Sequence, residues 1–200
     1  EMGYPYIFFT DNANNGAADV YKDKKLPIYA SNLCTEIMLP SNHDWSFVCV
    51  LSSINVLHYD KWKDTDAVET MIYFLDAVIT EFLEKLEVYR DSDNRDDQQT
   101  FLFMERAYNF SKENRALGMG VLGWHSLLQS KMLPFDSQGA YDLNSEVFKN
   151  IKEHSNKASK HLAEKFGEPE LLKGYGRRNT TLNAVAPTTS SAFILGQVSQ

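Results

Sequence analysis

The chain has 200 residues, 43% of them hydrophobic, and a net charge of −7. A chain of this size buries roughly 70% of its unfolded surface, so it can fold without disulfide cross-links. Two cysteines are too few for a disulfide-rich secreted scaffold. The negative charge argues against a nucleic-acid-binding protein, because such proteins neutralise phosphates with Lys and Arg. No apolar run reaches the roughly 20 residues that span a bilayer, so we expect a cytoplasmic protein that inserts into no membrane.

Three short runs in the first part of the chain are typical of β-strands. Tyr6–Thr10 is rich in strand-forming residues and is followed by the segment DNANNG, whose residues favour turns. Ser31–Leu39 and Phe47–Val56 are two further apolar runs, separated by the loop PSNHDW. We therefore predict three strands before residue 57.

Three helices are predicted after these strands. From Asp66 onward, apolar residues recur at the i, i+3, i+4, i+7 spacing of an amphipathic helix, and Glu69 completes a capping-box-like start. A second helix is expected from about Gln98 through residue 114, and a third over 144–166, with Gly167 as its C-terminal stop.

Two further segments complete the predicted organisation. Gly118, Gly120 and Gly123 lie in RALGMGVLGWHSLLQSK, where we expect them to permit close helix packing. The segment NTTLNAVAP has the composition of a β-strand. Strands mixed with long helices predict an α/β fold in one domain over residues 1–200. Because residue 1 is Glu and the C-terminal end lacks a helix stop, we expect both ends to be interior to a longer polypeptide.

The first cysteine has polar neighbours with a regular spacing. If residues 32–36 are extended, Asn32, Cys34 and Glu36 point to the same face. An amide, a thiol and a carboxylate in a row suit a site in which the cysteine does one-electron or nucleophilic work and the glutamate moves a proton. The alternative is a buried cysteine that acts as a small apolar residue. The flanking polar pair favours the site.

The second cysteine is harder to assign. Cys49 lies in the apolar run SFVCVLSS, so it is either a core residue, which composition favours, or a redox-active thiol. A zinc site from Cys34, His43, Cys49 and His58 is not expected, because the separations of nine, six and nine residues differ from the two to four typical of zinc ligand pairs.

A run of hydroxyl side chains follows Pro187. Thr188, Thr189, Ser190 and Ser191 would form a phosphate-binding turn if a helix begins there, because its N–H groups would point at the anion. An ordinary helix N-cap is the alternative interpretation.

Four segments, taken in order, resemble one family. They read SNLCTEI, CVLSSINV, RALGMGVLGW and RNTTLNAVAPTTSS. This order is similar to that in the large catalytic subunit of ribonucleoside-diphosphate reductase, over nearly all 200 residues. The resemblance implies the C-terminal half of a ten-stranded α/β barrel, with a central catalytic loop and flanking long helices. This half would be incomplete at both ends.

The resemblance also implies roles for individual residues. Cys34 would be the thiyl radical site that abstracts the 3'-hydrogen of the substrate ribose. Glu36 would accept the proton of the 3'-hydroxyl, and Asn32 would hydrogen-bond the same part of the sugar. Cys49 would be one of two thiols that reduce the 2' position and end as a disulfide. The substrate, a nucleoside diphosphate, would be held by further residues, namely Ser31, Leu33, Pro187, Thr188, Thr189, Ser190 and Ser191.

The family's cofactors and partners are expected outside this chain. The radical would come from a metal-containing small subunit or, as the weaker option, from cobalamin, and no residue here is assigned to bind either. An external dithiol such as thioredoxin would restore the thiols. The second reducing thiol would come from the remaining segments of the large subunit, and the assembled large subunit would be a homodimer. The chain alone is therefore expected to be inactive.

Two alternatives remain open at this level. The chain could be a non-catalytic half-barrel that binds nucleotide and serves as a scaffold, or a glycyl-radical relative on the same barrel. No glycine-radical loop is visible in the sequence, which disfavours the second alternative.

Overall fold

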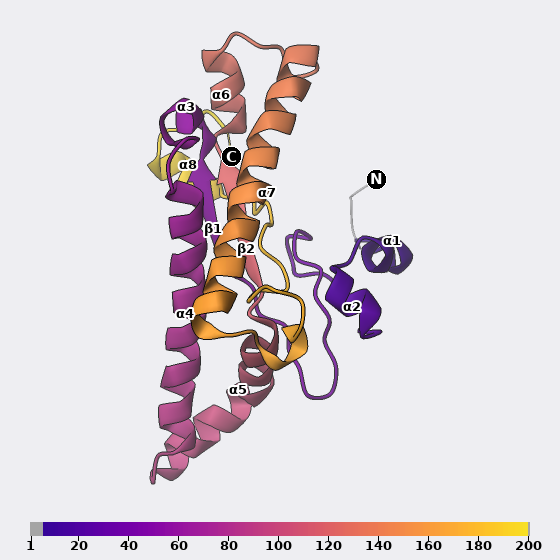
Figure 1. Ribbon diagram of the computed structural model, residues 1–200, viewed down its shortest axis with the longest axis vertical. Helices are drawn as coiled ribbons and strands as arrows, with labels where there is room; N and C mark the ends of the chain where they lie inside the picture. The colour runs from indigo at the N-terminus through magenta and orange to yellow at the C-terminus, as the bar shows by residue number, and fades with distance from the viewer. Residues whose placement is uncertain (1–5, 200) are drawn as a thin grey trace.

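The structure is a computed structural model that describes residues 6–199. Three long helices dominate it (Figure 1), and they are α4 (Ala67–Arg90), α5 (Arg95–Asn114) and α7 (Gln138–Phe166). The short elements are α1 (Thr10–Asn15), α2 (Asp19–Asp23), η1 (Val56–His58), α3 (Tyr59–Trp62), α6 (Trp124–Ser130), η2 (Glu170–Leu172) and α8 (Thr189–Ile194). Within the described range, no helix combines the length and the apolar character needed to cross a membrane.

A parallel pair of strands packs against α4. β1 (Val50–Asn55) pairs with β2 (Leu117–Leu122) from Val50 opposite Leu117 to Asn55 opposite Leu122. Parallel strands need a long crossover, and here α4 and α5 form it. Helices and strands thus confirm the predicted α/β fold.

The segment 181–184 runs along β2. Leu117 N donates to Thr181 O (3.0 Å), Met119 N to Leu182 O (2.8 Å) and Ala184 N to Met119 O (3.1 Å). The strand-like character of this segment is therefore expressed as an isolated bridge, Met119 to Asn183, and not as a named strand. These bonds carry the chain towards residues 187–191.

The apolar periodicity of α4 is confirmed, and its capping is not. The predicted stripe is buried at Val68, Ile72, Leu75 and Ile79, where α4 packs on the strands and on α7, and at Leu86, where it packs on α5. The side chain of the N-cap residue, position 66, makes no cap hydrogen bond. The acid at position 69 instead pairs with α7, so the capping box is wrong because a tertiary partner competes for the carboxylate.

The other two long helices agree with the sequence and extend further. α5 begins at Arg95, where Asn94 caps it through Asp96 N. α7 begins at Gln138 and ends at Phe166, and its C-cap Gly167 has a φ of 81°, a conformation that glycine adopts without strain. The predicted stop is confirmed.

The strand predictions before residue 57 are largely wrong. Residues 6–9 form no strand, and α1 begins at Thr10. Ser31–Leu39 contains a turn at residues 33–34 in place of a strand, and of Phe47–Val56 only Val50–Asn55 is a strand. Strand propensity is expressed where a neighbouring strand pairs with the segment, and β2 provides such a neighbour for β1.

The glycines at 118 and 120 are also reassigned. They lie in β2, where all six residues are buried, and not in a helix. A Cβ on Gly120 would come within 2.2 Å of Ala184 O, so glycine lets segment 181–184 approach the strand. Gly123 precedes α6 with a φ of 78°.

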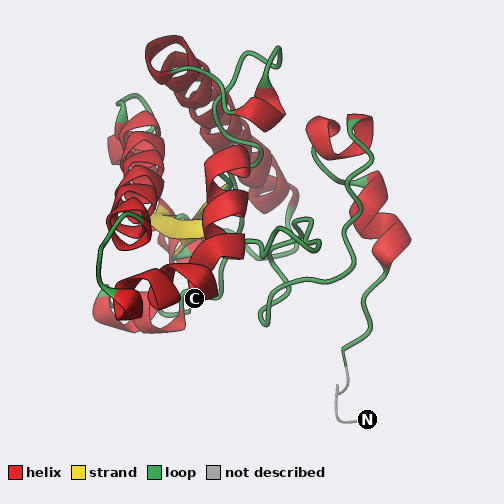
Figure 2. Cartoon of the chain, turned by 90° about the horizontal axis from the view of Figure 1, so that it is seen from below, coloured by secondary structure: helices red, strands yellow, loops and turns green. Residues whose placement is uncertain are grey.

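The described residues that precede β1 pack on the side of the long helices and the strands, as the end-on view in Figure 2 shows. Their own apolar cluster joins α2 to the end of α5, through Val20, Tyr21, Ile37, Trp45 and Phe110. The loop that carries the first cysteine belongs to this part of the chain.

Candidate active site

Cys34 lies at the tip of an exposed turn. Residues 33–34 form the turn, and Thr35 has a φ of 64°, so the chain reverses there. Thr35 N donates to Asn32 O (3.2 Å), which closes the turn. The thiol of Cys34 is free and exposed, so the alternative of a buried apolar cysteine is wrong.

Asn32 holds this loop together. Its Oδ1 accepts from Ile37 N (3.0 Å), and its N donates to Ile37 O (3.2 Å). The turn at Cys34 means that the period-two rule used for residues 32–36 does not apply, because that rule needs an extended backbone. The Nδ2 group of Asn32 makes no hydrogen bond within residues 6–199 and remains able to donate.

Glu36 points from the loop towards the second cysteine. Glu36 is half-buried, and its Oε2 is buried without a hydrogen-bond partner among the described residues. Burial raises the pKa of the Cys49 thiol to about 12, and the nearby charge of Glu36 adds to the increase. The thiol of Cys49 is therefore protonated at neutral pH.

Cys49 directly precedes β1 and rests on β2. A Cβ at Gly118 would lie 3.0 Å from its Sγ and 3.1 Å from the Cβ of Ala184, so glycine provides the space that the thiol occupies. Cys49 is half-buried and packs beside the N-terminal apolar cluster. The core interpretation is thus correct for its packing, while the unpaired thiol leaves the redox interpretation open.

Tyr21 is a neighbour of this site that sequence reasoning missed. Its hydroxyl donates to Asn114 Oδ1 (3.0 Å) and lies 2.7 Å from Thr180 Oγ1. Burial raises the pKa of Tyr21, and a hydrogen bond with Thr180 opposes this, while Cys49 adds a smaller increase. No local motif could reveal the contact, since its partners lie 93 and 159 positions away.

The substrate-contact candidates lie in two segments. Ser31 donates to Asn32 O (3.0 Å), and Leu33 is 84% exposed at the turn. The hydroxyl run begins a helix, as the phosphate-binding interpretation requires: Thr188 is the N-cap of α8 with a φ of 55°, and its O accepts from Ala192 N (2.8 Å). The Oγ1 of Thr188 is buried and unpartnered within the described chain.

The remaining members of the hydroxyl run face outward. Pro187, Thr189, Ser190 and Ser191 are exposed. In the first turn of a helix the N–H groups have no partner within the helix, so this turn can receive an acceptor from outside. Over residues 6–199, no three His, Cys, Asp or Glu side chains gather in a way that could hold a metal ion.

Comparison with known proteins shows the family of this chain. A family model described as "Ribonucleotide reductase, barrel domain" matches residues 1–171. A Frog virus 3 protein described as a ribonucleoside-diphosphate reductase large subunit is 40% identical over 194 residues, which cover 97% of this chain and 32% of that protein. The ribonucleoside-diphosphate reductase large subunit of Invertebrate iridescent virus 3 is 34% identical over 200 residues, covering 100% of this chain and 30% of the relative.

A solved structure is closely similar as well. The Actinobacillus ureae class Id ribonucleotide reductase alpha subunit is 56% identical and superposes with a TM-score of 0.89 over 99% of this chain and 36% of that one. The chain thus spans about a third of the length of the curated relatives it matches. On this evidence the chain belongs to the ribonucleotide reductase barrel-domain family.

Proposed function

We propose that this chain is the segment of a ribonucleotide reductase catalytic subunit that carries the radical-bearing cysteine and one reducing thiol. The observation that carries the proposal is the exposed thiol of Cys34 in one loop with Glu36, which lies near Cys49 and whose buried Oε2 has no hydrogen-bond partner among residues 6–199. A buried acceptor without a donor is uncommon in proteins, and a hydroxyl of a bound sugar would supply the donor.

Each loop residue has a proposed role in the first step. A thiyl radical on Cys34 takes the 3'-hydrogen of the ribose and becomes a thiol. Glu36 accepts the proton of the 3'-hydroxyl as general base. Asn32 donates from its Nδ2 to the same hydroxyl, since its Oδ1 is already committed to Ile37 N.

The reduction itself needs two thiols. Two S–H groups supply two electrons and two protons, the 2'-hydroxyl leaves as water, and the sulfurs join in a disulfide. The raised pKa of Cys49 supports this role, because a protonated thiol has a hydrogen to deliver. Positions 34 and 49 hold the two cysteines of the chain, so the second reducing thiol is proposed to come from another segment of the large subunit.

The substrate is proposed to be a nucleoside diphosphate held near α8. The backbone after Pro187 and the run Thr188–Ser191 would receive the diphosphate, supported by the unpartnered Oγ1 of Thr188. Ser31 and Leu33 would line the sugar side, because they border the turn of Cys34. Ala192, which is 2% exposed, contributes packing and no hydroxyl.

The proposal includes parts that lie outside this chain. We infer that residues 1–200 belong to the C-terminal half of a ten-stranded barrel and work with the remaining large-subunit segments, as a homodimer in the cytoplasm. A metal-containing small subunit, in preference to cobalamin, would generate the radical on Cys34, and a dithiol such as thioredoxin would reduce the disulfide.

Replacing the proposed radical residue tests this function. In the assembled large subunit with its small subunit, Cys34→Ser should reduce formation of deoxyribonucleotide to background, while substrate binding is retained. Lys160→Gln, an exposed change on α7, should leave turnover unchanged. If the chain is only a non-catalytic scaffold, both variants should form deoxyribonucleotide at the same rate. Unaltered turnover in Cys34→Ser would refute the proposal.

A further inference from the structure

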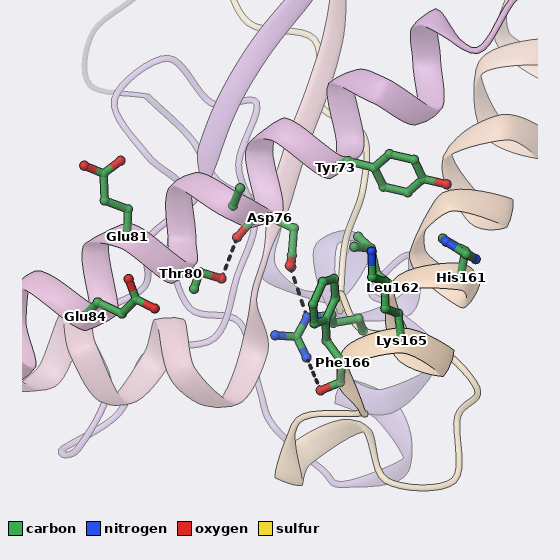
Figure 3. Close-up of a pocket in the computed structure, with 11 residues that line it drawn as sticks. Tyr73, Asp76, Thr80, Glu81, Glu84, His161, Leu162, Lys165 and Phe166 are labelled. Carbon is green, nitrogen blue, oxygen red and sulfur yellow. Dashed lines mark hydrogen bonds and ion pairs between the residues drawn. The ribbon is translucent and has the colours of Figure 1, made fainter.

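A cavity lined by neither cysteine opens between α4 and the end of α7. Its volume is about 500 Å³, within the range of about 300–1,000 Å³ typical of small-molecule sites. Figure 3 shows its lining, which comes from two helices and one residue of the following loop. The lining residues are Tyr73, Asp76, Ala77, Thr80, Glu81, Glu84, His161, Leu162, Lys165, Phe166 and Arg178.

The two walls of this cavity differ in charge. On α4 the acids Glu81 and Glu84 extend on one side, while His161 and Lys165 lie opposite on α7, as Figure 3 shows. Glu81 is already paired with Lys85 (2.6 Å). Lys165 Nζ lies 5.2 Å from the ring centroid of Phe166 and forms no ion pair within residues 6–199.

Below these walls, two arginines share one carboxylate. Asp76 Oδ1 accepts from Arg115 Nε (2.8 Å), and Asp76 Oδ2 accepts from Arg178 Nε (3.1 Å). The side chains of Asp76 and Arg115 are each 5% exposed, and that of Arg178 is 15% exposed. Two positive charges against one negative charge leave this buried group with a net positive charge.

Arg178 carries the part of this charge that reaches the cavity. Its Nη1 donates to Phe166 O (3.0 Å) and Gly167 O (2.8 Å), at the C-terminal end of α7. The helix dipole places about half a negative charge there, which offsets the excess only in part. The Nη2 group of Arg178 donates to no acceptor in the described range, and the side chain is not fully buried, so this group is able to donate to a ligand in the cavity.

We propose that this cavity is a binding site for a small amphipathic anion, with one phosphate or carboxylate group attached to an apolar ring. The headgroup would accept from Arg178 Nη2 and lie close to Lys165. The ring would pack on Leu162 and Phe166. Since Glu81 and Glu84 line the opposite wall, a second anionic group on that side would be repelled, so the ligand has one charged end. The proposal is independent of the ribonucleotide reductase assignment.

The cavity can be tested with simple probes in the assembled large subunit. Phenyl phosphate and benzoate present the two candidate headgroups, and benzyl alcohol presents the ring without a charge. Binding is measured by isothermal titration calorimetry. We expect one or both anions to bind at least about tenfold more tightly than the alcohol, as charge-assisted hydrogen bonds allow.

Variants then locate the bound probe. Ala77→Trp fills the cavity from an exposed position on α4 and leaves the buried charges intact, so the protein should fold and lose at least about tenfold in affinity. Lys165→Gln should weaken anion binding and leave alcohol binding unchanged. Lys160→Gln, exposed on the same helix but outside the cavity, is the matched control and should bind like the wild type.

Each outcome of these measurements either supports or overturns the proposed site. Loss of anion binding in Ala77→Trp and Lys165→Gln, with Lys160→Gln unchanged, supports the site. No anion binding to the wild type, equal binding of the alcohol, or full binding to Ala77→Trp overturns it. Which anion binds more tightly identifies the headgroup.

Discussion

The sulfur of Cys49 occupies space that the missing side chain of Gly118 leaves open. A Cβ at residue 118 would stand 3.0 Å from that sulfur and 2.3 Å from Leu51 Cδ2. Cys49 precedes β1 and Gly118 lies in β2, so the pairing of the two strands sets the position of the thiol. A glycine distant in sequence thereby becomes a positioning residue for the proposed redox chemistry.

Gly118→Ala should therefore destabilise the protein and displace the thiol. Overpacking of a buried site costs about 1–3 kcal/mol, which urea unfolding would detect. Gly16→Ala is a suitable control, since its Cβ would meet only backbone atoms at 3.4 Å or more. If both variants unfold at the same urea concentration, the close packing around Cys49 has been misjudged.

Cys49 should react slowly with alkylating reagents. With a pKa of about 12, only about 1 in 10,000 of its thiols is ionised at pH 8, and the thiolate is the reactive form. Iodoacetamide followed by peptide mass spectrometry should therefore label the exposed Cys34 first. Comparable labelling rates at both cysteines would contradict the buried, protonated state of Cys49.

Glu36→Gln should make Cys49 more reactive. Removing the negative charge of Glu36 favours the thiolate, so the pKa of Cys49 falls and alkylation accelerates. Burial, the larger cause, persists, and Cys49 should still react more slowly than Cys34. Asp44→Asn, which alters an exposed carboxylate, should leave the labelling rate of Cys49 unchanged.

Asp76→Asn should cause a large loss of stability. It removes the carboxylate that the buried Arg115 and the half-buried Arg178 share, and breaking a buried pair typically costs about 3–5 kcal/mol in the free energy of unfolding. The control Asp91→Asn breaks an exposed pair with Arg90 and should unfold like the wild type. Equal urea midpoints for the two variants would show that the buried cluster contributes little.

The same carboxylate predicts a loss of stability in acid. Burial by itself would raise the pKa of Asp76, but hydrogen bonds and charge from Arg115, with Arg178 and Asn179, outweigh it and lower the pKa below its usual value. A lowered folded-state pKa gives stability that is complete above the unfolded value of about 4. This stability is lost as the pH falls through the folded value.

Urea midpoints measured between pH 6 and pH 3 test this expectation. The wild type should lose stability below about pH 4, and Asp76→Asn should lose less over the same interval, since it lacks the titrating group. A variant with the same acid dependence as the wild type would assign that dependence to other carboxylates.

The long helices could be predicted because their signal is local. Apolar residues at helical spacing placed α4 within one residue of its observed start, and Gly167 marked the end of α7 correctly. The short strands could not be predicted in this way. Residues 6–9 have the composition of a strand but form none, because strand formation depends on a neighbour that the local sequence does not specify.

β2 carried a usable signal that was misread. Gly118 and Gly120 alternate with Leu117, Met119 and Val121, which is the period of two that a strand produces. The turn at Cys34 had no comparable signal, and its positive φ at Thr35 departs from the usual preference of threonine.

By itself, the sequence determined the α/β class and the long helices, because these depend on spacing along the chain. It also singled out Asn32, Cys34 and Glu36 as candidates, although the extended backbone assumed for them is a turn in the structure. The tertiary structure alone decided that Cys34 stands on an exposed turn, that Gly118 makes room for Cys49, and that Asp76 gathers two arginines. The physical reason is distance in sequence: Asp76 meets Arg115 across 39 positions and Arg178 across 102, and only the packing of α4 and the end of α5 with the segment after α7 brings those charges together.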